Sequence, residues 1–266
     1  MIPGESPSSG ACVLVSGGVE SSALLADAGL RYRKVTPVYI RNHLFWETAE
    51  LFWLKRFLKK IHAPKFQPLK VLELPMPEVY GRHWSTTGKN SPGPFSKDES
   101  VYLPGRNILF LAKAATYAAL NGIFFIEIGV LRGNPFGDSQ EIFFKKISEA
   151  LSLGLGQKIR VLAPFRKFKK EEVMAKFKEL PLEWTFSCIK PKGNYHCGVC
   201  NKCAERKRAF FSAGIADKTW YHASSSLPKK LQVQGATKRP RRRSGSYAAQ
   251  GSAGSNAADE VFSANC

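Results

Sequence analysis

Residues 11–30 read ACVLVSGGVESSALLADAGL, an apolar strand that ends in Ser-Gly-Gly and is followed at once by a helix. Two glycines at the end of a strand cost backbone entropy unless some group must approach the backbone closely. The turn brings several backbone N–H groups to the positive end of a helix dipole, which favours a bound anion. Ser16, Ser21 and Ser22 can add hydroxyl donors. We therefore predict a phosphate-binding turn, with a tight packing turn as the alternative.

Apolar segments alternate with amphipathic segments along most of the chain. Five segments are predicted to be strands: 11–16, 34–40, 69–74, 123–129 and 159–163. Five more are predicted to be helices: 20–28, 46–61, 107–121, 138–152 and 169–179. This alternation predicts an α/β fold with a doubly wound parallel five-stranded sheet and helices on both faces. Ligands of such sheets bind at the carboxyl ends of the strands, where the Ser-Gly-Gly turn lies.

Two local signals mark helix boundaries. Asn121-Gly122 is a typical stop for the helix predicted at 107–121. Asp138 and Glu141 have the spacing of a capping box, in which side chains bond to the free N–H groups of a first helical turn. We therefore expect one helix to end at Asn121 and the next to open at Asp138.

The chain of 266 residues is strongly basic, with 40 Lys and Arg, 21 Asp and Glu, and a formal net charge of +19. Such a field attracts phosphate-rich partners, from ATP to nucleic acid, and does not choose between them. Residues 1–10 lack the pattern of a signal peptide, and no apolar run approaches the roughly 18 residues of a membrane-spanning helix. These features predict a cytoplasmic protein that does not bind a membrane.

Four of the six cysteines lie close together in the sequence, at Cys188, Cys197, Cys200 and Cys203. Four thiolates suffice to close a tetrahedral site of the structural kind, with no open position for catalysis. Six basic residues flank them and would stabilise the deprotonated cluster: Lys190, Lys192, Lys202, Arg206, Lys207 and Arg208. Zinc is the expected metal, and an iron–sulfur cluster or disulfides are the alternatives.

The turn and the cysteines together resemble a known family. The segment SGGVESS resembles the SGGxDS loop that binds pyrophosphate in the ATP pyrophosphatase, or PP-loop, superfamily. The order and spacing of the two motifs resemble those of the 7-cyano-7-deazaguanine synthases over residues 11–211. The resemblance implies that seven residues bind ATP: Ser16, Gly17, Gly18, Val19, Glu20, Ser21 and Ser22. Glu20 stands where the family has Asp and keeps the charge of a magnesium ligand.

Further matches to the family lie between and around the two motifs. They are Pro104-Gly105-Arg106-Asn107, Gly129, Pro164, Lys170 and Thr185-Phe186-Ser187-Cys188. Asp138 falls where the Tyr-Pro-Asp-Cys-Arg stretch of the family has its Asp, whereas Ser139 and Gln140 replace the Cys and the Arg. The resemblance implies that Arg106, Lys170 and Asp138 act in catalysis. A surface arginine, a solvated lysine and a helix cap are the structural alternatives for these three residues.

The activity implied by the resemblance is an ATP-dependent carbon–nitrogen ligation. Members of the family adenylate 7-carboxy-7-deazaguanine, let ammonia displace AMP to give the amide, and adenylate the amide to leave the nitrile, a precursor of queuosine. The implied cofactors are ATP with Mg²⁺ and one structural Zn²⁺ per chain. The alternatives are a PP-loop relative that adenylates another acid or a macromolecule, a tRNA-modifying PP-loop enzyme, and an inactive zinc-stabilised binding protein.

The chain is predicted to contain an ordered part and two terminal segments. We expect a flexible N-terminus at residues 1–10, a PP-loop ATP-binding domain at 11–182 and a zinc-binding segment packed on it at 183–222. Residues 80–103, rich in Gly, Pro and Ser, are predicted to form a mobile active-site loop. Residues 223–266 are predicted to be a disordered basic tail that could bind nucleic acid, although the reaction requires none. A homodimer is compatible with these features.

Overall fold

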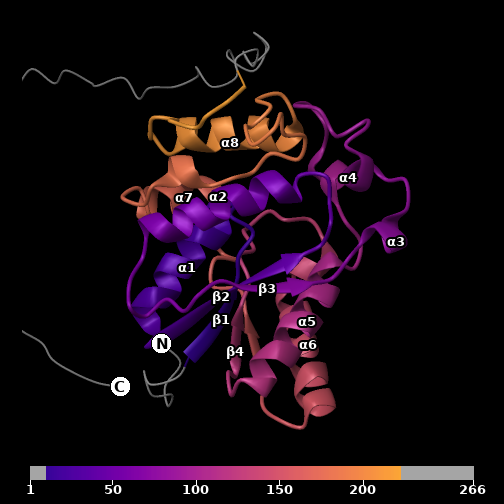
Figure 1. Ribbon diagram of the computed structural model, residues 1–266, viewed down its shortest axis with the longest axis vertical. Helices are drawn as coiled ribbons and strands as arrows, with labels where there is room; N and C mark the ends of the chain where they lie inside the picture. The colour runs from indigo at the N-terminus through magenta and orange to yellow at the C-terminus, as the bar shows by residue number, and fades with distance from the viewer. Residues whose placement is uncertain (1–9, 223–266) are drawn as a thin grey trace, which may run out of the picture. The chain divides into compact units, whose positions relative to one another are not determined.

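A computed structural model describes residues 10–222 of the chain. The described residues form a five-stranded sheet in which all neighbouring strands are parallel, in the order β3-β2-β1-β4-β5 (Figure 1). The strands are β1 (Gly10–Leu14), β2 (Lys34–Arg41), β3 (Lys70–Glu73), β4 (Phe125–Glu127) and β5 (Arg160–Leu162). The predicted doubly wound parallel sheet is confirmed. Its strand order reverses between β1 and β4, and such a switch point is where ligands of open parallel sheets bind.

Helices connect the strands. Within residues 10–222 the α-helices are α1 (Val19–Arg31), α2 (Glu47–Lys60), α3 (Pro77–Tyr80), α4 (Trp84–Thr87), α5 (Arg106–Leu120), α6 (Glu141–Leu155), α7 (Lys170–Lys176) and α8 (Asn201–Ser212). The 3-10 turns are η1 (Asp98–Val101), η2 (Gly137–Ser139) and η3 (Leu182–Trp184). The sequence did not predict α3, α4 or α8, because α3 and α4 are single turns and α8 is mostly polar.

Alternate residues of the strands pack against helices on opposite faces of the sheet, as the two-residue period of a strand requires. On one face, Val13 of β1 lies in a core cluster with Leu24 of α1, Leu54 of α2 and Val173 of α7. On the other face, the neighbouring residues of β1 pack with α5 and α6 in a second cluster. Cys12 lies in this second cluster and is fully buried, where it packs as a small hydrophobe.

The boundary predicted at Asn121 is confirmed, and the boundary predicted at Asp138 is wrong. Asn121 is the C-cap of α5. Asp138 lies in η2, and α6 begins only at Glu141, with Gln140 as its N-cap. A separate 3-10 turn forms before α6 because the Ser139 hydroxyl donates hydrogen bonds to the carbonyl oxygens of Asn134 and Phe136, at 3.0 and 2.6 Å. Asp138 is therefore free of any capping role in α6.

The segment 80–103 contains α4 and η1 and contacts the cysteine-rich part of the chain. The Asn201 backbone N–H donates to the carbonyl oxygen of Pro92, and the Asn201 side chain donates to that of Ser96. The mobility of this segment stays a prediction. The predicted flexible N-terminus and the predicted basic tail lie outside the described residues, except that Gly10 begins β1. Among the described helices, none has the length and apolar character needed to cross a membrane.

Candidate active site

The Ser16–Ser22 turn connects β1 to α1, and four residues separate the end of β1 at Leu14 from the start of α1 at Val19. Gly17 has a left-handed backbone with φ of +76°, a conformation that glycine adopts without strain. Gly18 is the N-cap of α1. Because glycine has no side chain, no side chain of the N-cap residue bonds to the N–H groups of the first helical turn. The hydroxyl of Ser21 donates to the Gly18 carbonyl oxygen and accepts from the Ser16 N–H, at 3.2 and 3.1 Å. The serines thus hold the turn in place around its glycines.

Gly129 lets the segment after β4 approach the first turn of α1. A Cβ atom at Gly129 would lie 3.1 Å from the Ser21 nitrogen and 3.2 Å from the Glu20 carbonyl carbon. Contacts this short with backbone atoms cannot be relieved by moving a flexible side chain, so a larger residue would push the two segments apart. Gly129 therefore keeps the Ser16–Ser22 turn tight against the switch point of the sheet.

A chain of ion pairs joins this turn to α7 and α8. The Lys170 ammonium lies 2.7 Å from Glu20 Oε1 and also pairs with Glu205. Lys202 Nζ lies 2.7 Å from the other oxygen of Glu205. The side chain of Lys170 is only 11% exposed, and the two carboxylates raise its pKa despite its burial. Lys170 is therefore a buried cation at the turn, and the solvated lysine weighed from the sequence is wrong.

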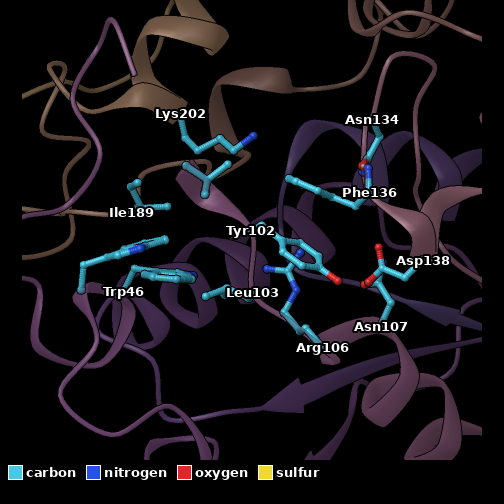
Figure 2. Close-up of a pocket in the computed structure, with 12 residues that line it drawn as sticks. Trp46, Tyr102, Leu103, Arg106, Asn107, Asn134, Phe136, Asp138, Ile189 and Lys202 are labelled. Atoms are coloured by element: carbon cyan, nitrogen blue, oxygen red, sulfur yellow. The ribbon is translucent and has the colours of Figure 1, made fainter. Parts of the chain in front are cut away.

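An aromatic pocket lies at the other end of this ion-pair chain (Figure 2). Its lining residues are Trp46, Trp84, Val101, Tyr102, Leu103, Arg106, Asn107, Asn134, Phe136, Asp138, Ile189 and Lys202. Two stacked ring pairs contribute to the lining. Trp46 and Trp84 have centroids 5.8 Å apart and planes inclined by 19°, and Tyr102 and Phe136 have centroids 4.3 Å apart and planes inclined by 26°. Such flat apolar faces suit a planar heterocycle.

Arg106 and Asp138 bring charges of opposite sign to the aromatic pocket. Arg106 is the first residue of α5, directly after Gly105, whose φ of +75° turns the chain into the helix. Within residues 10–222, its guanidinium has no ion pair and no hydrogen-bond acceptor. Arg106 is thus available to an anion that enters the pocket.

Asp138 is 8% exposed, and its Oδ1 has no hydrogen-bond partner among the described residues. Burial raises the pKa of its carboxyl group, while the charge of Arg106 and the N–H of Asn107 act in the opposite direction. Ser139 and Gln140, where this chain departs from the family pattern, do not belong to the lining of the pocket. The departures therefore fall beside the pocket and not in its wall.

Glu50 is an acidic residue of the site that sequence reasoning missed. It lies on α2, and its Oε1 accepts a hydrogen bond of 2.9 Å from the Tyr39 hydroxyl of β2. Burial raises its pKa to about 7, although the charge of Arg106 lowers it. The Glu50 carbonyl oxygen would lie 3.5 Å from a Cβ at Gly17, so α2 reaches both the turn and the pocket. No local sequence signal marks Glu50, because its neighbours come from distant parts of the chain.

The four predicted cysteines form one buried cluster. The sulfur atoms of Cys188, Cys197, Cys200 and Cys203 all lie within 4.8 Å of one another. The Cys188–Cys200 and Cys197–Cys203 distances are both 3.9 Å. Four thiolates around one tetrahedral zinc ion would be separated by about 3.8 Å, given Zn–S bonds of about 2.3 Å. The cluster can therefore hold a metal ion, and its sulfurs stand too far apart for disulfides.

Backbone donors complete the cluster and tie it to the turn. The N–H groups of Lys190 and Cys197 both point at Cys188 Sγ, at 3.3 Å, which favours a thiolate. Two residues before Cys188, the Phe186 N–H donates to the Gly17 carbonyl oxygen at 2.6 Å. His196 is not part of the cluster, since its Nε2 accepts from the Ser187 N–H. The cysteine segment is thus hydrogen-bonded to the Ser16–Ser22 turn itself.

Residues 10–214 match the model of the family described as queuosine biosynthesis protein QueC. The chain belongs to this family. It is 31% identical over 231 residues to a 7-cyano-7-deazaguanine synthase of Leptospira interrogans, covering 80% of this chain and 91% of the relative. It is 28% identical over 237 residues to a 7-cyano-7-deazaguanine synthase of Methanococcus aeolicus, covering 79% of this chain and 97% of the relative. The family resemblance inferred from the two motifs is confirmed.

The chain is also similar to solved structures of low sequence identity. One is a 4-thiouridine synthetase–RNA complex with bound ATP, with a TM-score of 0.41 and 16% identity over 77% of this chain and 50% of that one. Another is a predicted subunit of a tRNA methyltransferase from Methanocaldococcus jannaschii, with a TM-score of 0.42 and 16% identity over 64% of this chain and 75% of that one.

Within this family fold, the residues predicted from the sequence fall into three groups. The Ser16–Ser22 turn with Lys170 forms one group, Arg106 and Asp138 share the aromatic pocket, and the cysteines form the third. Lys202 and Glu205 of α8 connect the first two groups. The three groups therefore belong to one continuous region at the carboxyl ends of the strands.

Proposed function

We propose that this chain is an ATP-dependent ligase that converts 7-carboxy-7-deazaguanine and ammonia to 7-cyano-7-deazaguanine. Besides the family match, one observation supports it most: an anion-binding turn and an aromatic pocket with an unpartnered arginine lie at two ends of one ion-pair chain. A planar acid in the pocket and ATP phosphates at the turn would meet there. No Ser-His-Asp set is needed for this chemistry, because the carboxylate of the substrate is itself the nucleophile.

The reaction proceeds through two adenylations. In the first, a carboxylate oxygen of the acid attacks the α-phosphorus of ATP, and the bond to pyrophosphate breaks. Ammonia then attacks the acyl carbon, AMP leaves, and the amide forms with loss of a proton. In the second adenylation the amide oxygen attacks the α-phosphorus of a second ATP, and the bond to pyrophosphate breaks. Loss of AMP and of the two remaining nitrogen-bound protons then leaves the nitrile. Catalysis of such steps depends on positioning and on cations near the transferred phosphate.

The chain has suitable groups for each of these needs. We assign the pyrophosphate to the backbone N–H groups and hydroxyls of the Ser16–Ser22 turn and to the Lys170 ammonium. We assign the substrate carboxylate, and the charge that develops on the α-phosphate, to Arg106. We assign Mg²⁺ to Glu20, whose carboxylate would hold the ion beside the phosphates, where the ion would neutralise phosphate charge.

The metal of the cysteine cluster is proposed to be zinc with a structural role. The four thiolates supply all the ligands of a tetrahedral ion and leave no position for substrate. The ion would hold the segment that donates a hydrogen bond to Gly17 and that carries Lys202 and Glu205. Cytoplasmic location, a homodimer and binding of nucleic acid by the basic tail stay predictions.

The proposal is tested by incubating the purified protein with ATP, Mg²⁺, ammonium and 7-carboxy-7-deazaguanine and following AMP and the heterocycle by mass spectrometry. We expect AMP and the nitrile to appear together and to depend on ammonium. AMP formed with an unchanged heterocycle would indicate adenylation of another acid. Neither product, from protein that contains its metal, would overturn the proposed function.

A further inference from the structure

Asp138 carries a buried acceptor that the adenylation chemistry does not use. Its Oδ1 is buried and has no hydrogen-bond partner within the described residues. A buried polar atom without a partner costs about 1–3 kcal/mol, so native proteins retain such atoms where a ligand or another partner satisfies them. The residue sits in the wall of the aromatic pocket and not in the helix cap that the sequence suggested. Its position therefore calls for a hydrogen-bond donor on the ligand.

The backbone around Asp138 is held independently of any ligand. The Ser139 hydroxyl bonds to the carbonyl oxygens of Asn134 and Phe136, and the Phe136 N–H donates to the Asn134 side chain at 3.1 Å. These bonds close the η2 turn beneath the Phe136 ring, which stacks on Tyr102. Figure 2 shows the Tyr102 hydroxyl pointing toward the Asp138 carboxylate along this wall of the pocket. The carboxylate is thus presented at the edge of a flat aromatic surface.

A carboxylate accepts two parallel N–H groups from a planar N–C–N fork, as it does from the guanidinium of arginine. The 2-aminopyrimidinone ring of a 7-deazaguanine has the same fork, formed by its ring N–H and its 2-amino group. The opposite end of the proposed substrate carries a carboxylate. The pocket has the complementary pair of charges, with the Asp138 carboxylate and the unpartnered Arg106 guanidinium both in its lining.

We propose that Asp138 is a specificity-determining residue, whose carboxylate accepts the ring N–H and the 2-amino N–H of the substrate while flat aromatic faces hold the ring. This inference rests on the proposed function and adds to it the group by which the heterocycle is recognised. A site that accepts hydrogen bonds from N–H groups of its substrate strongly rejects analogues that lack these groups, because the buried acceptor of the site is then left unpaired. Asp138 selects guanine-like over hypoxanthine-like heterocycles.

The test is a calorimetric titration of the protein with 7-cyano-7-deazaguanine and with the analogue that has hydrogen in place of the 2-amino group. We expect the wild-type protein to bind the amino-bearing heterocycle with a dissociation constant that is lower by about 100-fold or more. Asp138→Asn keeps the shape of the side chain but replaces one acceptor by a donor, so the preference should fall to a few-fold. Asp98→Asn is the matched control, because Asp98 is an exposed acid on η1, and it should leave the preference unchanged.

The outcomes separate this inference from the proposed function. A wild-type protein that forms the nitrile but binds both heterocycles equally overturns the inference and leaves the function standing. An Asp138→Asn protein that melts like the wild type and keeps the full preference overturns the inference as well. A wild-type protein that binds neither heterocycle and forms no nitrile overturns both.

Discussion

Lys170 Nζ lies 2.7 Å from Glu20 Oε1, so the lysine of α7 is bound to the first turn of α1 before any phosphate arrives. Because Glu205 holds the same ammonium from α8, the lysine links three helices around the Ser16–Ser22 turn. Lys170 is thus held beside the turn that is proposed to bind the phosphates. Glu20, where the family has aspartate, is the residue of the turn that pairs with Lys170.

Replacing this lysine tests its proposed role at the leaving pyrophosphate. Lys170→Met should lower the rate of AMP formation by about 100-fold, because a preorganised cation near the transferred phosphate is lost. It also leaves Glu20 and Glu205 without their shared cation, so the melting temperature should fall. Assays well below that temperature separate the two effects. Lys167→Met, at an exposed position before α7, should change neither quantity. An unchanged rate of AMP formation in Lys170→Met would contradict the assignment.

The turn itself is tested by Gly18→Val. The backbone of Gly18, with φ of −67° and ψ of 162°, suits valine. Its Cβ would lie 3.3 Å from the ends of the Glu20 and Ser16 side chains and 3.7 Å from the Phe186 carbonyl oxygen, an ordinary van der Waals contact. The fold should therefore survive, while the new side chain occupies the space next to the N–H groups of the turn. Pyrophosphate release should be abolished. Gly154→Val, at an open position of α6, is the control and should keep activity. Normal pyrophosphate release from Gly18→Val would refute the turn as the phosphate site.

The cysteine cluster predicts a stability effect that depends on metal. Cys200→Ser should lose the bound ion and unfold at a markedly lower temperature, because a structural metal contributes folding free energy. Cys12→Ser removes a buried thiol of β1 outside the cluster, so it should retain one ion per chain, measured by elemental analysis. A chelator should lower the melting temperature of the wild type and of Cys12→Ser but not that of Cys200→Ser. If Cys200→Ser keeps its ion and melts as the wild type does, the cluster is not the metal site.

Glu50 predicts how stability depends on pH. Its pKa rises from 4.5 to about 7 on folding, so between these values the unfolded chain is ionised at Glu50 and the folded chain is protonated. The contribution of Glu50 to stability is therefore complete below pH 4.5 and is lost as the pH rises to 7. The loss is up to about 3 kcal/mol, less the part that water screens at this partly exposed side chain.

Glu50→Gln removes this titration while its amide oxygen can still accept the hydrogen bond from Tyr39. The variant should therefore be more stable than the wild type at pH 8 and equally stable at pH 4, by denaturant unfolding at each pH. A stability difference that stays constant from pH 4 to pH 8 would show that Glu50 has an ordinary pKa.

The sequence predicted the sheet and the motifs because both depend on local patterns. The strand at 11–16, its glycines and the cysteine spacing are short-range features, and the structure confirms the parallel sheet and the cysteine cluster. The first helix was also predicted, since its apolar residues repeat at helical spacing after Gly18. These features need no knowledge of distant neighbours.

The pocket and its charges could not be predicted in the same way. Glu50 owes its raised pKa to burial beside Tyr39. Asp138 owes its buried, unpartnered acceptor to a turn that Ser139 closes, at a position where the sequence pattern indicates a helix start. The family resemblance pointed to Lys170, but only the fold shows that Glu20 and Glu205 pair with its ammonium. Tertiary contacts decide these groups, and a linear pattern does not contain them.

The measurement that tests the central claim most directly is the stoichiometry of the reaction with ¹⁵N-labelled ammonium. The wild-type protein, ATP, Mg²⁺ and 7-carboxy-7-deazaguanine are incubated, and the AMP and the nitrile are quantified by mass spectrometry. We predict two AMP for every nitrile, and one ¹⁵N atom in each nitrile. Nitrile that contains no ¹⁵N, or AMP that accumulates while the acid stays unchanged, would contradict the account.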